Sequence, residues 1–194
     1  MEIRTIIVIG ASTGGPQTLS LVIARLPVLD ASVLIVQHMP KYINESIVRR
    51  LAELSRMKVK LGENGEWLEN GTIYVAPSDV HMKLQNNRTI ELAAGEKINY
   101  VRPAIDVTMK SIQRSSGINT IGVVLTGMGS DGTKGIRHIK SLGGATIAQN
   151  EDSCVIYGMP KAAVSTGMVD FILSPEEIGD KITELVNCPI SALA

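Results

Sequence analysis

A glycine-rich turn near the N-terminus constrains this chain more than any other stretch. The run at residues 5–9 is β-branched and apolar and predicts a buried strand, which leads into Gly10-Ala11-Ser12-Thr13-Gly14. Residues 17–26 then predict a helix, which Pro16 can begin because a proline there loses no hydrogen bond. A tight turn between a strand and a helix leaves Ser12 exposed at the sheet edge, and G-x-S-x-G in this context is typical of a nucleophilic serine.

The same turn has a second interpretation. A glycine-rich loop that opens a helix also binds anions, because its free N–H groups and the helix dipole face the ligand. The segment alone leaves a nucleophile and a phosphate site open. Ser12 needs a histidine and a carboxylate from elsewhere in the chain before it can act as a nucleophile.

Length and composition narrow the class of protein. The 194 residues suffice for one domain, which we expect at residues 1–187, with residues 188–194 as a tail. The 19 basic and 19 acidic residues balance, and aromatic residues are only 3 %, so neither nucleic acid nor an anionic membrane is favoured as a partner. Apolar runs are too short to span a membrane, and no signal-peptide pattern is present. Cys154 and Cys188 lack metal-ligand spacing, so we expect a cytoplasmic protein with reduced thiols and no metal.

Strands and helices alternate along most of the chain. This order is typical of an α/β fold, a doubly wound and mostly parallel sheet with helices on both faces. The middle differs, because short runs and the turn-forming residues Asn86-Asn87 predict a small antiparallel insertion. The further predicted strands are 32–36, 59–61, 72–75, 80–84, 89–92, 120–125, 145–148 and 169–173. The further predicted helices are 43–56, 104–115, 133–142, 160–165 and 175–186.

Two of these helices have candidate caps. Ser174, Pro175 and Glu177 fit a capping box with proline at the first helical position. Asn44 lies near the start of the helix at 43–56 and could cap it.

Three polar side chains follow three predicted parallel strands. Ser12, His38 and Asp131 each lie just beyond a strand's carboxyl end, where ligands bind in open parallel sheets. Residues distant in sequence can therefore meet there as a Ser-His-Asp triad. The alternatives are that His38 only satisfies a hydrogen bond and that Asp131 only caps the next helix. His81 and His138 fit ordinary surface or packing roles.

A second glycine-rich turn competes with this interpretation. Residues 127–132 fit G-x-G-x-x-G between a strand and a helix, and Glu151 stands about 20 residues further on, as in dinucleotide-binding folds. Against it, Asp131 would place a negative charge beside a pyrophosphate, and the motif is not on the first strand. The glycines also let the N–H groups near Met128 face an active site and bind an oxyanion.

A set of motifs, taken together, resembles a known family. The chain is similar, from about Ile6 to Val186, to the catalytic domain of the chemotaxis protein-glutamate methylesterases. The motifs are Ile9-Gly10-Ala11-Ser12-Thr13-Gly14-Gly15-Pro16, Gln37-His38-Met39-Pro40, Tyr74-Val75-Ala76-Pro77, Arg102-Pro103-Ala104-Ile105-Asp106, Leu125-Thr126-Gly127-Met128-Gly129-Ser130-Asp131-Gly132, Ala148-Gln149-Asn150-Glu151 and Tyr157-Gly158-Met159-Pro160.

The resemblance implies a doubly wound parallel sheet with one antiparallel edge. It implies hydrolysis of glutamate methyl esters on the cytoplasmic helices of chemoreceptors, deamidation of receptor glutamines, and no cofactor. It also implies Ser12, His38 and Asp131 as the catalytic residues and the Met128 amide as an oxyanion donor.

The remaining expectations concern contacts and regulation. We expect a group at Thr13 to assist the oxyanion, and Arg102 and Met159 to contact substrate. The receiver domain that the family usually carries is not in this sequence. Two alternatives stay open, a piece of a longer protein and a stand-alone enzyme, and a separate regulatory receiver domain is a candidate partner. The alternative function is a module that binds a nucleotide or phosphate at the two glycine-rich turns.

Overall fold

The computed structural model describes residues 3–188, and nine strands and six helices are present in that part of the chain. The strands are β1 (Thr5–Ala11), β2 (Ser32–Gln37), β3 (Lys58–Leu61), β4 (Thr72–Val75), β5 (His81–Gln85), β6 (Thr89–Ala93), β7 (Asn119–Val124), β8 (Ala145–Gln149) and β9 (Phe171–Leu173). The helices are α1 (Gly15–Arg25), α2 (Asn44–Leu54), α3 (Ile105–Ser111), α4 (Thr133–Ser141), α5 (Met159–Val164) and α6 (Pro175–Asn187), with a 3₁₀ turn at Lys41–Ile43.

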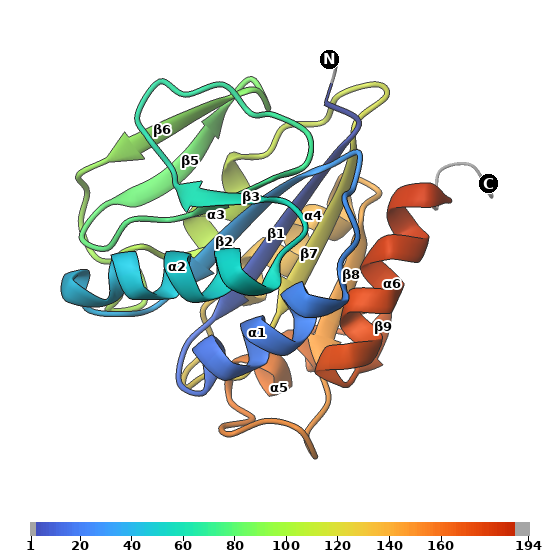
Figure 1. The fold of residues 1–194 in the computed structure, drawn as a ribbon. Coiled ribbons are helices and arrows are strands. Elements are labelled where there is room, and N and C mark those ends of the chain that lie inside the picture. The colour runs from blue at the N-terminus through green and yellow to red at the C-terminus, as the bar shows by residue number, and fades with distance from the viewer. Residues whose placement is uncertain (1–2, 189–194) are drawn as a thin grey trace.

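Seven strands form one sheet in the order β3-β4-β2-β1-β7-β8-β9. All neighbours pair in parallel, and the sheet extends from β1 in both directions, with β2 on one side and β7 on the other, as the doubly wound prediction requires. On the β2 side, β4 lies between β2 and the edge strand β3. Helices α1, α2 and α6 lie on one face, and α3, α4 and α5 lie on the other (Figure 1). This architecture brings the carboxyl ends of the central strands to one edge.

The antiparallel part is smaller than predicted. Among the strands of residues 3–188, only β5 and β6 are antiparallel, and they form a separate hairpin whose turn residues Asn86 and Asn87 have the expected positive φ, 51° and 57°. Strands β3 and β4 instead join the main sheet in parallel, and both sheet edges are parallel too. The prediction of an antiparallel edge was therefore wrong. The β4 run Thr72–Val75 is fully buried, as expected of a parallel strand covered on both faces, but four residues do not reveal the strand's partner.

One of the two predicted helix caps is confirmed. Ser174 and Glu177 form a reciprocal capping box at the start of α6. Asn44 does not cap α2, because the 3₁₀ turn places Ile43 at the N-cap. The Asn44 side chain accepts a hydrogen bond from the Ser78 hydroxyl at 2.8 Å instead. The predicted tail lies, apart from Cys188, outside the described residues.

The sheet is buried on both faces. Ile7 and Ile9 of β1 pack toward α1, α2 and α6, whereas Ile6 and Val8 pack toward α3, α4 and the β5–β6 hairpin. All four side chains are completely buried. Dense packing of this kind fixes the strand ends and the loops that follow them.

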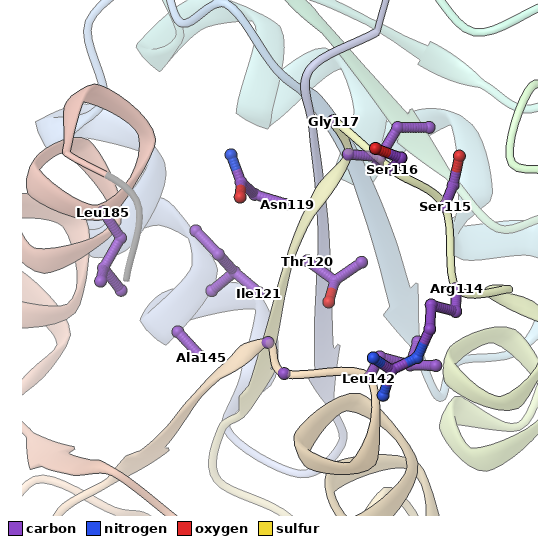
Figure 2. Close-up of a pocket in the computed structure, with 13 residues that line it drawn as sticks. Arg114, Ser115, Ser116, Gly117, Asn119, Thr120, Ile121, Leu142, Ala145 and Leu185 are labelled. Carbon is purple, nitrogen blue, oxygen red and sulfur yellow. The ribbon is translucent and has the colours of Figure 1, made fainter. Parts of the chain in front are cut away.

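A hollow of about 470 Å³ lies where β7 and β8 begin, at the end of the sheet opposite to the carboxyl ends of the strands (Figure 2). Side chains from several elements line it, among them Arg114, Thr120, Ile121 and Leu185. Ser12, His38 and Asp131 do not line it. Within residues 3–188, no helix is long and apolar enough to cross a membrane.

Candidate active site

Ser12 and His38 follow neighbouring parallel strands in register. Ala11 of β1 pairs with Gln37 of β2, so the next residue on each strand is Ser12 or His38. The His38 N–H donates to the Ala11 carbonyl at 3.0 Å. The buried Gln37 amide donates to the carbonyls of Ser12, at 2.9 Å, and His38, at 2.8 Å. One side chain thus joins the backbones of both residues.

The glycines of the first turn have separate structural roles. A Cβ on Gly10 would lie 2.5 Å from Ile105, so glycine lets the start of α3 approach the end of β1. Gly14 has φ 81° and is the N-cap of α1. The Ser12 N–H donates to the Thr126 carbonyl at 3.0 Å, which joins the first glycine-rich turn to the second.

Asp131 completes a hydrogen-bonded pair with His38. One carboxylate oxygen, Oδ2, lies 2.9 Å from His38 Nε2, and both side chains are largely buried. Burial by itself raises the pKa of Asp131, but hydrogen bonds from His38, Ile105 and Asp106 outweigh it and hold the pKa below its ordinary value. The carboxylate is therefore ionised and accepts hydrogen bonds only.

This charge state assigns the histidine tautomer. Because ionised Asp131 has no proton to give, His38 Nε2 carries the hydrogen and Nδ1 has the free lone pair. Within residues 3–188, neither His38 Nδ1 nor the Ser12 hydroxyl has a hydrogen-bond partner. Catalytic contacts often tighten only when substrate binds, so Nδ1 is the nitrogen available to Ser12.

Asp131 caps a different helix from the one suggested by its position in the sequence. Gly132, with φ 94°, is the N-cap of α4, and because glycine has no side chain, the N-cap itself makes no side-chain hydrogen bond to the helix. Asp131 instead accepts the N–H groups of Ile105, at 2.7 Å, and Asp106, at 3.1 Å, in the first turn of α3. In return, Asp106 accepts the N–H of Gly135 in α4 at 2.8 Å. Asp106 of α3 thus binds α4, and Asp131, in the turn that leads into α4, binds α3.

The second glycine-rich turn exposes backbone donors beside Ser12. A Cβ on Gly127 would lie 2.6 Å from Ser12 Cβ, so the two turns are in close contact. The Gly127 carbonyl accepts the N–H of Met159 at 2.8 Å, which fixes the turn. Among the described residues, nothing accepts from the Met128 N–H, and the Met128 side chain is 75 % exposed. Thr13 is exposed at the first turn.

The two expected substrate contacts lie in different surroundings. Arg102 is partly exposed and donates to the Gly95 carbonyl, and its Nε has no hydrogen-bond partner within residues 3–188. Met159 is completely buried, and its sulfur would lie 2.6 Å from a Cβ on Gly127. Met159 therefore supports the second turn from below. Substrate contact by either residue stays a prediction.

Several residues of the site carried no role in the sequence interpretation. Gln37 and Asp106 belong to the motifs quoted above, so the sequence indicates that these positions matter, but it does not indicate which hydrogen bonds they make. Buried Gln149 accepts the Thr126 N–H at 2.7 Å and steadies the second turn. Asn99, which binds both Asp106 and Asp131 at 3.1 Å, belongs to none of the motifs.

The chain has extensive similarity to known proteins. A sequence model described as CheB methylesterase matches residues 7–182. Proteins named protein-glutamate methylesterase/protein-glutamine glutaminase are 41 % identical in Archaeoglobus fulgidus and 44 % identical in Pyrococcus horikoshii, each over 95 % of this chain. The matches cover 54 % and 51 % of those relatives, so the chain spans about half their length.

A solved structure agrees with the fold. The crystal structure of the Thermotoga maritima CheB methylesterase catalytic domain matches with a TM-score of 0.86 and 42 % identity. The match covers 93 % of this chain and 97 % of that one. None of these similarities supports the nucleotide- or phosphate-binding alternative. From its sequence and its fold, the chain belongs to the CheB methylesterase family.

Proposed function

We propose that this protein is a serine hydrolase that removes methyl esters from glutamate side chains of chemoreceptors and releases methanol. The observation that carries the proposal is the ionised Asp131, which holds His38 beside Ser12 at the ends of adjacent strands. The family and the names of the relatives support the same reaction. The relatives' second activity supports deamidation of receptor glutamines at the same site.

The first half of the reaction forms an acyl-enzyme. His38 Nδ1 takes the hydroxyl proton as Ser12 Oγ attacks the ester carbonyl carbon. Asp131 stabilises the imidazolium through Nε2 and keeps its own negative charge. When the tetrahedral intermediate collapses, the C–O bond to the methoxy group breaks, and His38 gives its proton to the departing methoxy oxygen, which leaves as methanol.

The second half regenerates the enzyme. His38 removes a proton from water, the hydroxide adds to the acyl carbon, and Ser12 leaves with a proton from His38. The product is a glutamate carboxylate. With a glutamine substrate the leaving group is ammonia, and the same groups act on it. We predict that neither half of the reaction uses a metal or a cofactor.

The two glycine-rich turns supply the candidate hydrogen-bond donors to the oxyanion. The Met128 N–H, which has no acceptor in the described part of the chain, lies on the turn that contacts Ser12, and Thr13 is the residue next to Ser12. A fixed donor at this position is typically worth about 3 kcal/mol in transition-state stabilisation. We assign these donors to Met128 and Thr13.

The partner and the compartment follow from the proposed substrate. The ester-bearing side chains would be presented by the cytoplasmic helices of methyl-accepting chemoreceptors, which places the reaction in the cytoplasm. A separate regulatory receiver domain is a further proposal about partners, suggested by the family resemblance.

Methanol release from methylated chemoreceptor membranes tests the proposal. We expect the purified chain to release methanol as receptor esters disappear, and a fluorophosphonate to label Ser12, located by mass spectrometry. Labelling without methanol release would keep the nucleophile and reject the chemoreceptor ester as substrate. Failure of both would reject the serine hydrolase itself.

A substitution at Gly15 tests the link between Gln37 and the two catalytic backbones. In Gly15→Ala, the new Cβ would lie 2.0 Å from Gln37 Oε1, so the glutamine has to move away from Ser12 and His38. Because misplacement by about 1 Å can cost about 100-fold, we expect kcat for methanol release to fall by about 10- to 100-fold.

The matched control for this change is Gly95→Ala. The nearest atom to a Cβ on Gly95 lies 3.5 Å away, an ordinary contact, so activity should persist. Wild-type activity in Gly15→Ala would show that the Gln37 bridge does not position the site.

A further inference from the structure

The side-chain amide of Asn99 lies between two buried carboxylates. Its Nδ2 is 3.1 Å from Asp106 Oδ2 and 3.1 Å from Asp131 Oδ1. Both aspartates are 3 % exposed, whereas Asn99 itself is exposed and covers them from the solvent side. An amide nitrogen carries two hydrogens, so it can donate one to each carboxylate.

A tight hairpin places this amide. Ile98 and Val101 exchange backbone hydrogen bonds of 3.1 and 3.0 Å, with Asn99 and Tyr100 as the two residues of the turn. Their φ values are 53° and 66°, the left-handed region that asparagine tolerates better than most residues. The backbone of this turn therefore directs the Asn99 amide over the two carboxylates.

The two carboxylates have opposite electrostatic situations. Burial raises the pKa of Asp106 above its ordinary value, and the charge of Asp131 contributes in the same direction. The pKa of Asp131 is lowered, because its hydrogen-bond donors outweigh burial. Asp131 is the carboxylate that binds His38. Asp106 lies next to it, and a negative charge on one of the two aspartates opposes ionisation of the other.

We propose that Asn99 is a positioning residue that separates Asp106 from Asp131 by donating to both, and so keeps Asp131 aimed at His38 as a carboxylate. Asn99 acts through Asp131 and His38 and does not touch the reacting atoms. The proposal rests on the proposed function: methanol release depends on the proposed substrate, whereas fluorophosphonate labelling depends only on Ser12 being a nucleophile that His38 activates.

The test replaces the amide without straining the turn. Asn99→Gly keeps the left-handed backbone and removes the donor. The matched control is Asn86→Gly, the same change at φ 51° in the β5–β6 hairpin. We expect Asn99→Gly to slow fluorophosphonate labelling of Ser12 and kcat for methanol release by about 10-fold, with KM unchanged. Asn86→Gly should leave both rates at the wild-type level.

A double variant separates charge from hairpin structure. In Asn99→Gly/Asp106→Asn the competing carboxylate is gone, so we expect labelling to return to within about threefold of wild type. Asn99→Asp keeps the side-chain shape but adds a third carboxyl group, and we expect it to lose at least as much as Asn99→Gly. This single variant tests the proposal even if the double variant does not fold.

The outcomes are distinct. Wild-type labelling in Asn99→Gly or in Asn99→Asp would overturn the proposal. A loss in Asn99→Gly that a folded double variant does not reverse would also overturn it, because the amide would then act only through the hairpin. If the wild type releases no methanol but labelling follows the expected pattern, the proposed substrate fails and the role of Asn99 stands.

Discussion

Ser12→Ala is expected to abolish methanol release, with a fall in kcat of about 10⁶-fold, because no acyl-enzyme can form without the hydroxyl. Among the described residues, nothing hydrogen-bonds to that hydroxyl, so its removal leaves no buried group without a partner. The melting temperature should therefore stay close to that of the wild type. Activity is measured as methanol released from methylated receptors, and stability by thermal unfolding followed by circular dichroism.

The control for this substitution is Ser165→Ala. Ser165 is exposed just after α5, and its hydroxyl donates to the Lys161 carbonyl at 2.8 Å. Full methanol release is expected from it. Release by Ser12→Ala at a rate near that of the wild type would assign the nucleophile to another residue.

Asp131→Asn is the second change with a large expected effect, a loss in rate of up to about 10⁴-fold. Oδ1 of Asp131 accepts from Asp106, Gly132 and Asn99, whereas Oδ2 accepts from His38 and Ile105. An asparagine amide group would take the side with fewer donors and face His38. Nε2 then has to accept a hydrogen bond, Nδ1 carries the proton, and Nδ1 can no longer take one from Ser12.

The same change has a pH-dependent effect on stability. The folded pKa of Asp131 lies below its ordinary value of 3.8, so its stabilising contribution is present above that pH and is lost as the pH falls through the folded pKa. We expect Asp131→Asn to lower the free energy of unfolding by about 1–3 kcal/mol at pH 7. The difference should shrink below about pH 4 in denaturant titrations.

An acid on the neighbouring loop provides the comparison for Asp131→Asn. Asp152 is exposed, and Asp152→Asn should change neither the rate nor the stability by a measurable amount. Asp131→Asn with wild-type kcat would show that His38 does not need this carboxylate.

The sequence predicted which candidate residues come together better than the contacts that support them. The placement of Ser12, His38 and Asp131 at one edge could be predicted because each follows a strand, and parallel strands end at one edge. The hydrogen bonds of Asn99 and Asp106 could not be predicted. They join a hairpin and two helices that are apart in the sequence, and no local sequence pattern indicates that these segments meet. Asp131 shows the same limit, since its position before α4 suggested a cap for α4 and it binds α3.

The errors in the predicted fold have a related cause. The short runs that became β3 and β4 resemble the runs of the β5–β6 hairpin, and only long-range pairing separates them. By contrast, the Ser174 capping box is local, and the prediction matches the structure residue by residue.

The exchange of carboxylates between α3 and α4 has a consequence for how the site comes apart. Ser12 and His38 follow strands of the sheet. Asp131 is held instead by backbone N–H groups of α3, and Asp106 of α3 in turn accepts the Gly135 N–H of α4. The first turns of α3 and α4 therefore open together, as one cooperative unit, in a local fluctuation. Such an opening would separate Asp131 from His38 while Ser12 stays in place at the end of β1, so we expect the hydrogen bond between Asp131 and His38 to depend on two short helices as well as on the sheet.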